Sequence, residues 1–148
     1  MRPATLSEAV TRIERGEPAE KAWPEFLDTF YLAPDQRARA AVLADEPAFT
    51  GDPKLDALAA ASASYLSKLF RLPVPTWTAD RRRVLDEPWF TGVSDAPGMR
   101  EYLTFSSPAE FRCRNIFTEE RPLRRAIGAG AARCPGDRGS QFHPAEPI

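Results

Sequence analysis

The sequence contains a single histidine and little cysteine, which limits the chemistry available to the chain. Its 148 residues include His143, Cys113 and Cys134. Catalytic Ser-His-Asp and Cys-His arrangements need an imidazole that the fold holds in place, and His143 lies in a C-terminal stretch without periodicity. A structural zinc site needs four Cys or His ligands, one more than this chain provides. We therefore expect no histidine catalysis and no metal site.

Glycine-rich phosphate loops and long apolar runs are also absent from the sequence. Neither G-x-x-x-x-G-K-[ST] nor G-x-G-x-x-G occurs, so we expect no cofactor. No apolar run approaches the roughly 20 residues that span a bilayer. The opening residues MRPATLSEAV lack the apolar region of a signal peptide. These absences predict a cytoplasmic protein without a membrane partner, whose cysteines are reduced thiols.

Carboxylates are plentiful, and they leave one enzymatic alternative open. Neighbouring residues on a helix point in different directions, so adjacency does not bring two carboxylates to one substrate. We expect solvated charges at helix ends and no enzyme; a small enzyme that combines carboxylates from dispersed segments is the alternative. The adjacent acidic pairs are Asp45-Glu46, Asp86-Glu87 and Glu119-Glu120.

One cysteine has cationic neighbours in the sequence. Cys113 lies between Arg112 and Arg114, and nearby cations lower the pKa of a thiol and favour the thiolate. A single cysteine on a short helix, without an assured base beside it, is more often a small buried residue. We expect the buried role here.

The sequence does contain a series of amphipathic helices. Thr5 and Glu8 form a capping box at the start of the first one. Asp52 and Pro53 suit the N-cap and first position of the longest one. With 43% hydrophobic residues and the length of one domain, the chain is predicted to form a compact, irregular all-α bundle of about six to eight helices.

Fifteen prolines, about twice the usual share, set most of the expected helix boundaries and make the connections proline-rich. The second helix begins near Pro24 or is longer and kinked there. The 79–85 helix has Thr78 as its expected N-cap, and Ser107 with Glu110 forms a second capping box. The expected helices cover residues 6–15, 24–32 or 19–32, 34–44, 53–72, 79–85, 96–105 and 108–113, with a last turn over 122–127.

Two further expectations concern the second half of the chain. The 96–105 helix is predicted to direct Met99, Tyr102 and Leu103 inward, and Asn115 suits a left-handed position after the 108–113 helix. From residue 128 onward the sequence has no helical periodicity and is rich in glycine, proline and charged residues. The domain organisation expected is one helical domain over 1–127 and a disordered tail over 128–148.

Large aromatic side chains occur in two proline-rigidified connections. Trp77 follows Pro75, while Trp89 and Phe90 follow Pro88. Such rings bury about 150–250 Å² each and dominate interfaces as well as cores. Two interpretations stay open: the tryptophans close the ends of the bundle, or the rings form a rigid docking edge.

Arginine is concentrated in the second half of the chain. Residues 1–60 carry a net charge of −4, and residues 61–148 a net charge of +3. Acidic residues interleave with the arginines, and no convincing helix-turn-helix occurs. This pattern favours a solvated face or an acidic protein partner, with a nucleic-acid-associated transcriptional regulator as the alternative. The arginines are Arg81, Arg82, Arg83, Arg112, Arg114, Arg121, Arg124 and Arg125.

Several motifs between residues 5 and 127 together resemble those of an actinobacterial helical domain. They are Trp23-x-x-Phe26-Leu27-Asp28-x-Phe30-Tyr31, Asp45-Glu46-Pro47, Gly51-Asp52-x-x-Leu55-Asp56-Ala57-Leu58, Pro75-x-Trp77, Pro88-Trp89-Phe90 and Ser107-Pro108-Ala109-x-Phe111-Arg112-x-Arg114-Asn115-Ile116-Phe117. The domain that they resemble occurs alone or after a helix-turn-helix region in predicted regulators, near nucleotidyltransferase-like toxins. The helix-turn-helix region has no match in this chain, which favours contact with protein over contact with DNA.

The leading hypothesis follows from this resemblance and from the missing catalytic groups. It is a non-enzymatic regulatory or antitoxin-like domain that binds another protein, such as a toxin or a regulator. The candidate partner-binding residues are Trp77, Trp89, Phe90, Arg112, Arg114, Asn115 and Phe117.

Overall fold

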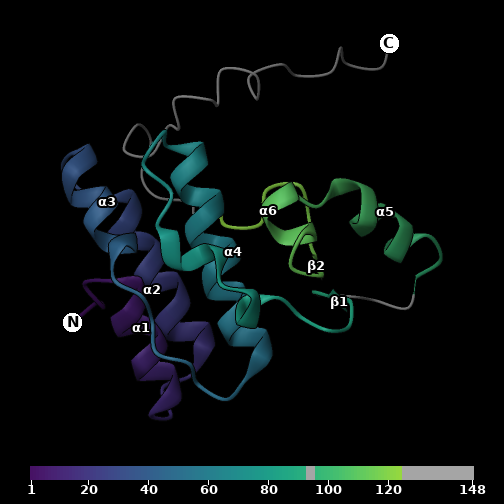
Figure 1. Ribbon diagram of the computed structural model, residues 1–148, viewed down its shortest axis with the longest axis horizontal. Helices are drawn as coiled ribbons and strands as arrows, with labels where there is room; N and C mark the ends of the chain where they lie inside the picture. Colours follow the sequence, from purple (N-terminus) through teal and green to yellow (C-terminus); the bar gives the residue numbers. More distant parts are fainter. Residues whose placement is uncertain (93–95, 125–148) are drawn as a thin grey trace.

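The chain folds into a mostly helical structure, seen in a computed structural model that describes residues 1–92 and 96–124 (Figure 1). The α-helices are α1 (Leu6–Glu14), α2 (Ala19–Tyr31), α3 (Gln36–Ala44), α4 (Pro53–Leu69), α5 (Met99–Ser106) and α6 (Ala109–Arg112). Two short 3₁₀ helices, η1 (Thr76–Ala79) and η2 (Arg81–Arg83), and two short strands, β1 (Trp89–Phe90) and β2 (Ile116–Phe117), complete the described elements. The prediction of a compact helical fold is confirmed.

Side chains cap three of the first four helices. The Glu8 amide donates to the Thr5 hydroxyl at 3.0 Å, as the capping box predicts. The Glu8 carboxylate, however, accepts from the Ala4 amide at 2.7 Å rather than from Thr5. Asp35 and Asp52 cap α3 and α4 in the same manner. Each cap satisfies a backbone donor that a helix start otherwise leaves without a partner.

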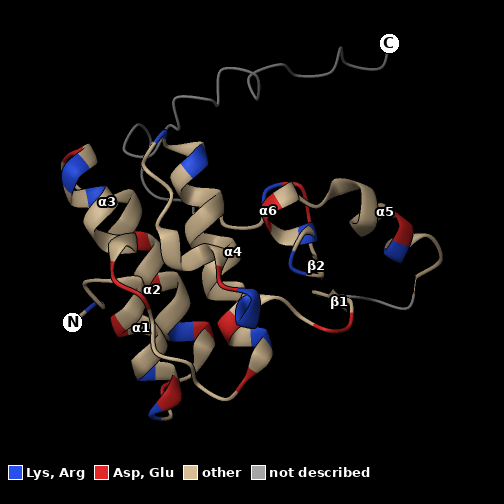
Figure 2. Ribbon diagram, viewed as in Figure 1, with Lys and Arg blue, Asp and Glu red and all other residues tan. Residues whose placement is uncertain are grey.

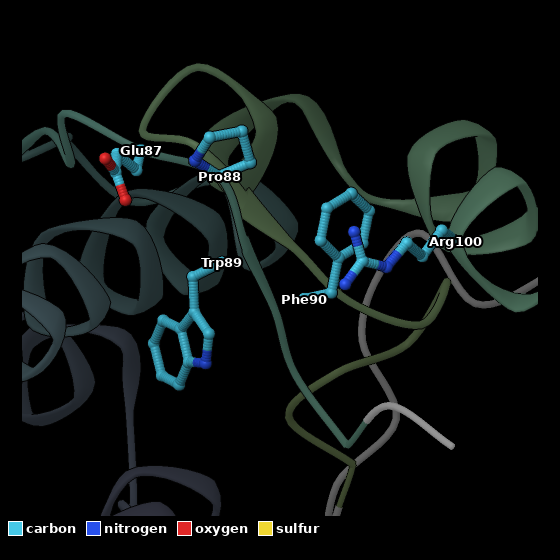
Figure 3. A pocket seen from close by; sticks show the side chains of 5 residues that line it. All are labelled: Glu87, Pro88, Trp89, Phe90 and Arg100. Atoms are coloured by element: carbon cyan, nitrogen blue, oxygen red, sulfur yellow. The ribbon is translucent and has the colours of Figure 1, made fainter. Parts of the chain in front are cut away.

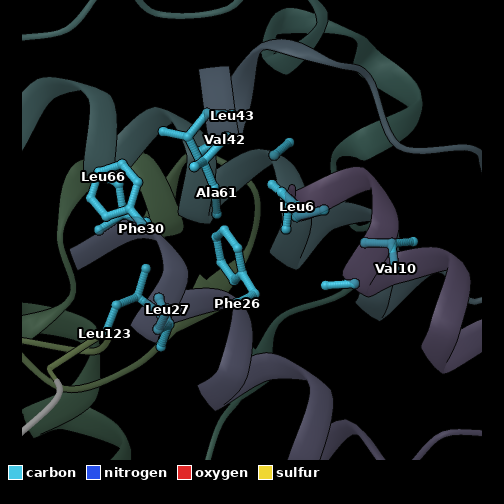
Figure 4. Close-up of a cluster of buried hydrophobic side chains, with 14 of the residues drawn as sticks. Leu6, Val10, Phe26, Leu27, Phe30, Val42, Leu43, Ala61, Leu66 and Leu123 are labelled. Atoms are coloured by element: carbon cyan, nitrogen blue, oxygen red, sulfur yellow. The ribbon is translucent and has the colours of Figure 1, made fainter. Parts of the chain in front are cut away.

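The hydrophobic core lies among α1, α2, α3 and α4 (Figure 4). The middle of α4 consists of small residues, and Ala59, Ala60, Ala61 and Ala63 are completely buried. Their small size allows the neighbouring helices to approach closely, while the large side chains of those helices fill the space between. The complete burial of Phe26 alone contributes about 1.5–3 kcal/mol.

The helix α2 follows the longer of its two predicted forms. It starts at Ala19 and contains Pro24 in its interior. Proline lacks an amide donor, so one hydrogen bond of the helix is missing at this position. Phe26, Leu27 and Phe30 are nevertheless buried just beyond the proline, and this packing compensates for the missing bond.

The segment 76–85 and the start of α6 differ from prediction. Residues 76–83 form two 3₁₀ turns instead of an α-helix over 79–85, and Asp80, rather than Thr78, caps the second turn. Ser107 is not a helix cap, because α6 starts without a side-chain cap. Its hydroxyl instead accepts from the Thr118 amide at 2.7 Å and donates to the Leu103 carbonyl. Ser107 therefore joins α5 to the segment after β2.

The two strands form a parallel pair that the all-helical prediction missed. Trp89 pairs with Ile116, and Phe90 pairs with Phe117. The Trp89 amide donates to the Asn115 carbonyl at 2.8 Å, and the Thr91 amide donates to the Phe117 carbonyl at 2.9 Å. We refer to β1, α5, α6 and β2 together as the C-terminal lobe, which lies to one side of the α1–α4 bundle (Figure 1).

The end of the described chain packs back onto the bundle. The Tyr31 hydroxyl donates to the Leu123 carbonyl at 2.8 Å, and the Leu123 side chain is buried near Leu27 (Figure 4). Residues 122–124 are not helical, contrary to the predicted last turn. Residues 125–127 of that turn and the predicted tail over 128–148 lie outside the described residues. None of the helices in the described ranges is long and apolar enough to cross a membrane.

Candidate interaction surface

Trp77 belongs to the interior of the protein and does not contribute to a docking edge. Its side chain is buried, and its indole Nε1 donates to the Leu43 carbonyl at 3.2 Å. The guanidinium of Arg83 lies over the ring, 5.0 Å from its centroid. Burial therefore favours the interpretation of Trp77 as a residue of the bundle, since its polar atom has a partner and Arg83 lies over its ring.

Arg114 and Asn115 attach the lobe to residues 78–85, and both side chains already donate hydrogen bonds within the protein. The buried Arg114 guanidinium donates to the Glu110 carbonyl at 2.6 Å and to the Thr78 carbonyl at 2.8 Å. Burial lowers its pKa, although the nearby Cys113 and Glu110 oppose that shift. The side-chain amide of Asn115 (Nδ2) donates to the Leu85 carbonyl at 2.6 Å, and the Asn115 backbone has φ of 63°. The left-handed conformation of Asn115 was predicted correctly.

The arginines divide into internal and exposed groups. Arg83 is fully buried, and exposed Arg82 forms an ion pair with Asp80 at 2.7 Å. Arg112 is exposed, as is Cys113, which contradicts the buried role expected for that cysteine. Charges of both signs are distributed over the bundle and the lobe (Figure 2). The described arginines thus do not form one continuous cationic surface.

Phe90 and Phe117 form an aromatic stack on one face of the strand pair. Their rings lie 4.9 Å apart at an interplanar angle of 19°. The guanidinium of Arg100, from the first turn of α5, lies over the Phe90 ring at 5.3 Å. Both phenylalanines are half-buried, so this stack of a cation and two rings contributes to the molecular surface.

Trp89 occupies the opposite face of β1, because successive strand residues point to opposite faces. Its half-buried ring packs against the core and lies 5.3 Å from the Lys54 ammonium. The rings of residues 89 and 90 therefore lie on two sides of the same short strand. Trp89 connects β1 to the start of α4, whereas Phe90 connects β1 to α5 within the lobe.

A surface pocket of about 530 Å³ follows β1 (Figure 3). Pro88, Trp89 and Phe90 provide apolar walls, while Glu87 and Arg100 provide opposite charges at its two sides. Apolar walls with a few charged groups are typical of sites that bind a ligand or a side chain. Sequence reasoning found Trp89 and Phe90 but missed Arg100, because α5 meets β1 only through tertiary packing.

The helix α5 carries the most exposed aromatic residues of the lobe. Phe105 is 82% exposed and Tyr102 is 54% exposed, whereas Leu103 is buried. The prediction that Tyr102 faces inward is therefore wrong. Tyr102 and Phe105 are three residues apart and so lie side by side on the helix. Sequence reasoning did not single out Phe105, because periodicity does not show whether the fold covers an apolar residue.

The described carboxylates do not form a metal site. Within residues 1–92 and 96–124, no group of three or more His, Cys, Asp or Glu side chains is arranged to hold a metal ion. The hydrogen bonds from the Arg82 side chain, followed by the bond from its backbone amide, lower the pKa of Asp80 to about 2. A carboxylate held ionised in this way is a poor proton donor near neutral pH. The chain matches no known family model, no curated protein and no solved structure.

Proposed function

We propose that this chain is a non-enzymatic regulatory or antitoxin-like domain that binds another protein through its C-terminal lobe. The single observation that carries the proposal is the exposure of two large aromatic side chains, Tyr102 and Phe105, on α5. The resemblance of the sequence to helical domains of predicted regulators supports the same class of function. Another protein, such as a toxin or a regulator, is the partner that this proposal expects.

The energetics of α5 support an interaction role. An isolated helix of eight residues is marginal in water, and only Leu103 on α5 is buried. A partner that covers Tyr102 and Phe105 buries up to about 150–250 Å² for each ring. Aromatic side chains of this kind are common among the residues that dominate binding energy. Binding at this face therefore stabilises both the complex and the helix.

Variants of the exposed rings test the proposal. The tagged chain, at its native expression level, is expected to co-purify one specific protein at a fixed stoichiometry. The double variant Tyr102→Ser with Phe105→Ser is expected to lose that protein. Leu32→Ser is the matched control, since Leu32 is 44% exposed at the end of α2 and lies outside the lobe.

Circular dichroism separates loss of binding from loss of fold in this experiment. Surface substitutions of this type usually change the free energy of unfolding by less than about 0.5 kcal/mol, so both variants should retain the helical spectrum. The proposal fails if the double variant retains the partner as well as the Leu32→Ser control does. It also fails if no specific protein accompanies the wild-type chain.

A further inference from the structure

The strand β1 has an outer edge that faces away from β2. The amides of Trp89 and Thr91 donate to β2, and backbone groups alternate in direction along a strand. The N–H and C=O of Phe90 therefore point to the opposite edge. Neither group has a hydrogen-bond partner within the described residues, and the described strands form a sheet of β1 and β2 only, so no third described strand pairs with this edge (Figure 1).

Two charged groups flank this edge without an internal partner. Arg100 is stacked over Phe90, and its guanidinium has no ion pair or hydrogen bond in the part of the chain that the structure describes. The same holds for the Glu87 carboxylate among the described residues. Figure 3 shows these two groups at opposite sides of the pocket, with Pro88 and Phe90 between them. Stacking orients the guanidinium while leaving its N–H donors free.

We propose that the outer edge of β1 accepts an extended peptide segment of the partner as an additional strand. This inference rests on the proposed function. The backbone of the segment pairs with the Phe90 N–H and C=O, as in other cases of strand addition. An apolar side chain of the segment enters the pocket beside Phe90, one of its carboxylates binds Arg100, and one of its cationic side chains binds Glu87.

The placement of the two charges defines the partner segment further. Glu87 lies on a bend of the chain before β1. Arg100 lies over Phe90 itself. The partner segment should therefore carry an acidic and a basic residue on the two sides of an apolar residue. This pattern is the charge complement of the pocket.

A second copy of this chain fits the edge less well than a peptide does. An antiparallel pair of β1 strands centred on Phe90 brings two Arg100 guanidiniums together, and like charges at a strand pair are destabilising. Pro88 also lacks the N–H that would point to this edge, which shortens any ladder formed by two such strands. A peptide with complementary charges avoids the repulsion and pairs at Phe90.

Selection from a peptide library tests this inference. The full chain, immobilised, is used to select from a phage-displayed library of random 12-residue peptides, and the enriched peptides are synthesised and titrated. We expect a consensus in which an apolar residue lies between an acidic and a basic residue. Arg100→Gln should weaken binding by about 10- to 150-fold, since a charge-assisted hydrogen bond contributes about 1.5–3 kcal/mol.

A matched pair of variants at residue 90 tests the backbone contact. Phe90→Ala and Phe90→Pro both remove the ring, but only Phe90→Pro also removes the outward N–H. Proline is tolerated on an edge strand when its missing N–H faces outward. We expect Phe90→Ala to retain weakened binding and Phe90→Pro to lose it. In the wild-type chain, hydrogen exchange of the Phe90 amide should slow when peptide binds.

Several distinct results would contradict the proposal that β1 accepts a peptide strand. The inference is wrong if no peptide is enriched, if Phe90→Pro binds as well as Phe90→Ala, or if exchange of the Phe90 amide is unchanged in the bound state. If circular dichroism shows that Phe90→Pro is unfolded, the exchange measurement decides. A dimer in sedimentation that protects the Phe90 amide would favour a second copy and overturn the peptide assignment. None of these results affects the test with Tyr102 and Phe105, so failure here leaves the proposed function standing.

Discussion

At the scale of single residues, Arg83 shows how a charged side chain can serve as an internal connector. It is fully buried, and its guanidinium donates to the backbone carbonyls of Asp56 and Pro47. The rings of Phe49 and Trp77 lie 4.2 and 5.0 Å from the guanidinium carbon. Arg83 thus ties the segment before α4 to the start of α4 and to η1.

Loss of this connector should destabilise the fold. Arg83→Ala removes a large buried side chain and leaves the buried Pro47 carbonyl without its donor, while the Asp56 carbonyl keeps its partner within α4, so we expect the free energy of unfolding to fall by about 3 kcal/mol. Arg81→Ala is the control, since Arg81 is exposed two positions earlier, and should change it by less than about 0.5 kcal/mol. Urea denaturation measures both values; equal midpoints for the two variants would contradict this role of Arg83.

The pKa of Asp80 provides a second test at the residue scale. Hydrogen bonds from Arg82 hold this pKa at about 2, below the ordinary value of 3.8. The stability that this carboxylate contributes is therefore present above its ordinary pKa and is lost as the pH falls through about 2. In Arg82→Gln, the pKa of Asp80 should rise towards 3.8. Carbon NMR of the carboxyl group measures the shift, and an unchanged pKa would argue against the pair in solution.

At the scale of elements, the short strand pair depends on both the backbone and the side chain of Asn115. This residue has φ of 63°, and its side-chain amide donates to the Leu85 carbonyl at 2.6 Å. Its own carbonyl accepts from Trp89. Asn115 therefore fixes both the turn after α6 and the start of the pairing between β1 and β2.

Two substitutions separate the conformational role of Asn115 from its hydrogen bond. Asn115→Gly keeps access to positive φ and loses the bond, whereas Asn115→Ala loses the bond and also disfavours the conformation by about 1 kcal/mol. We expect thermal unfolding to rank the wild type first, the glycine variant second and the alanine variant last. An alanine variant as stable as the glycine variant would mean that residue 115 does not retain positive φ in solution.

The elements that sequence reasoning predicted well are those whose signals are local. The cap at Thr5, the cap at Asp52 and the left-handed Asn115 each depend on residues within a few positions of one another. The strand pair was missed because β1 and β2 lie far apart in the sequence and have only two residues each. The Ser107 hydroxyl was misread for the same reason, since its partner Thr118 is eleven residues away.

At the scale of the whole molecule, the bundle and the lobe use their aromatic residues differently. In the bundle, Phe26, Phe30 and Phe70 are buried, which accounts for a core that helical periodicity predicted. In the lobe, Phe111 is buried against the core, whereas Phe90 remains half-buried and Phe105 is exposed. Periodicity identifies an apolar face but not whether the fold covers it, so the part of the candidate surface on α5 could not be predicted from the sequence.

The central claim is that the C-terminal lobe is the surface by which this chain binds its partner. Site-specific photocrosslinking in living cells tests it directly, with a photoreactive phenylalanine analogue introduced at position 105 or, as the control, at position 32. Position 105 should give a crosslink to one specific protein, and position 32 should give none. Equal crosslinking at both positions, or a specific crosslink from position 32 alone, would contradict the claim.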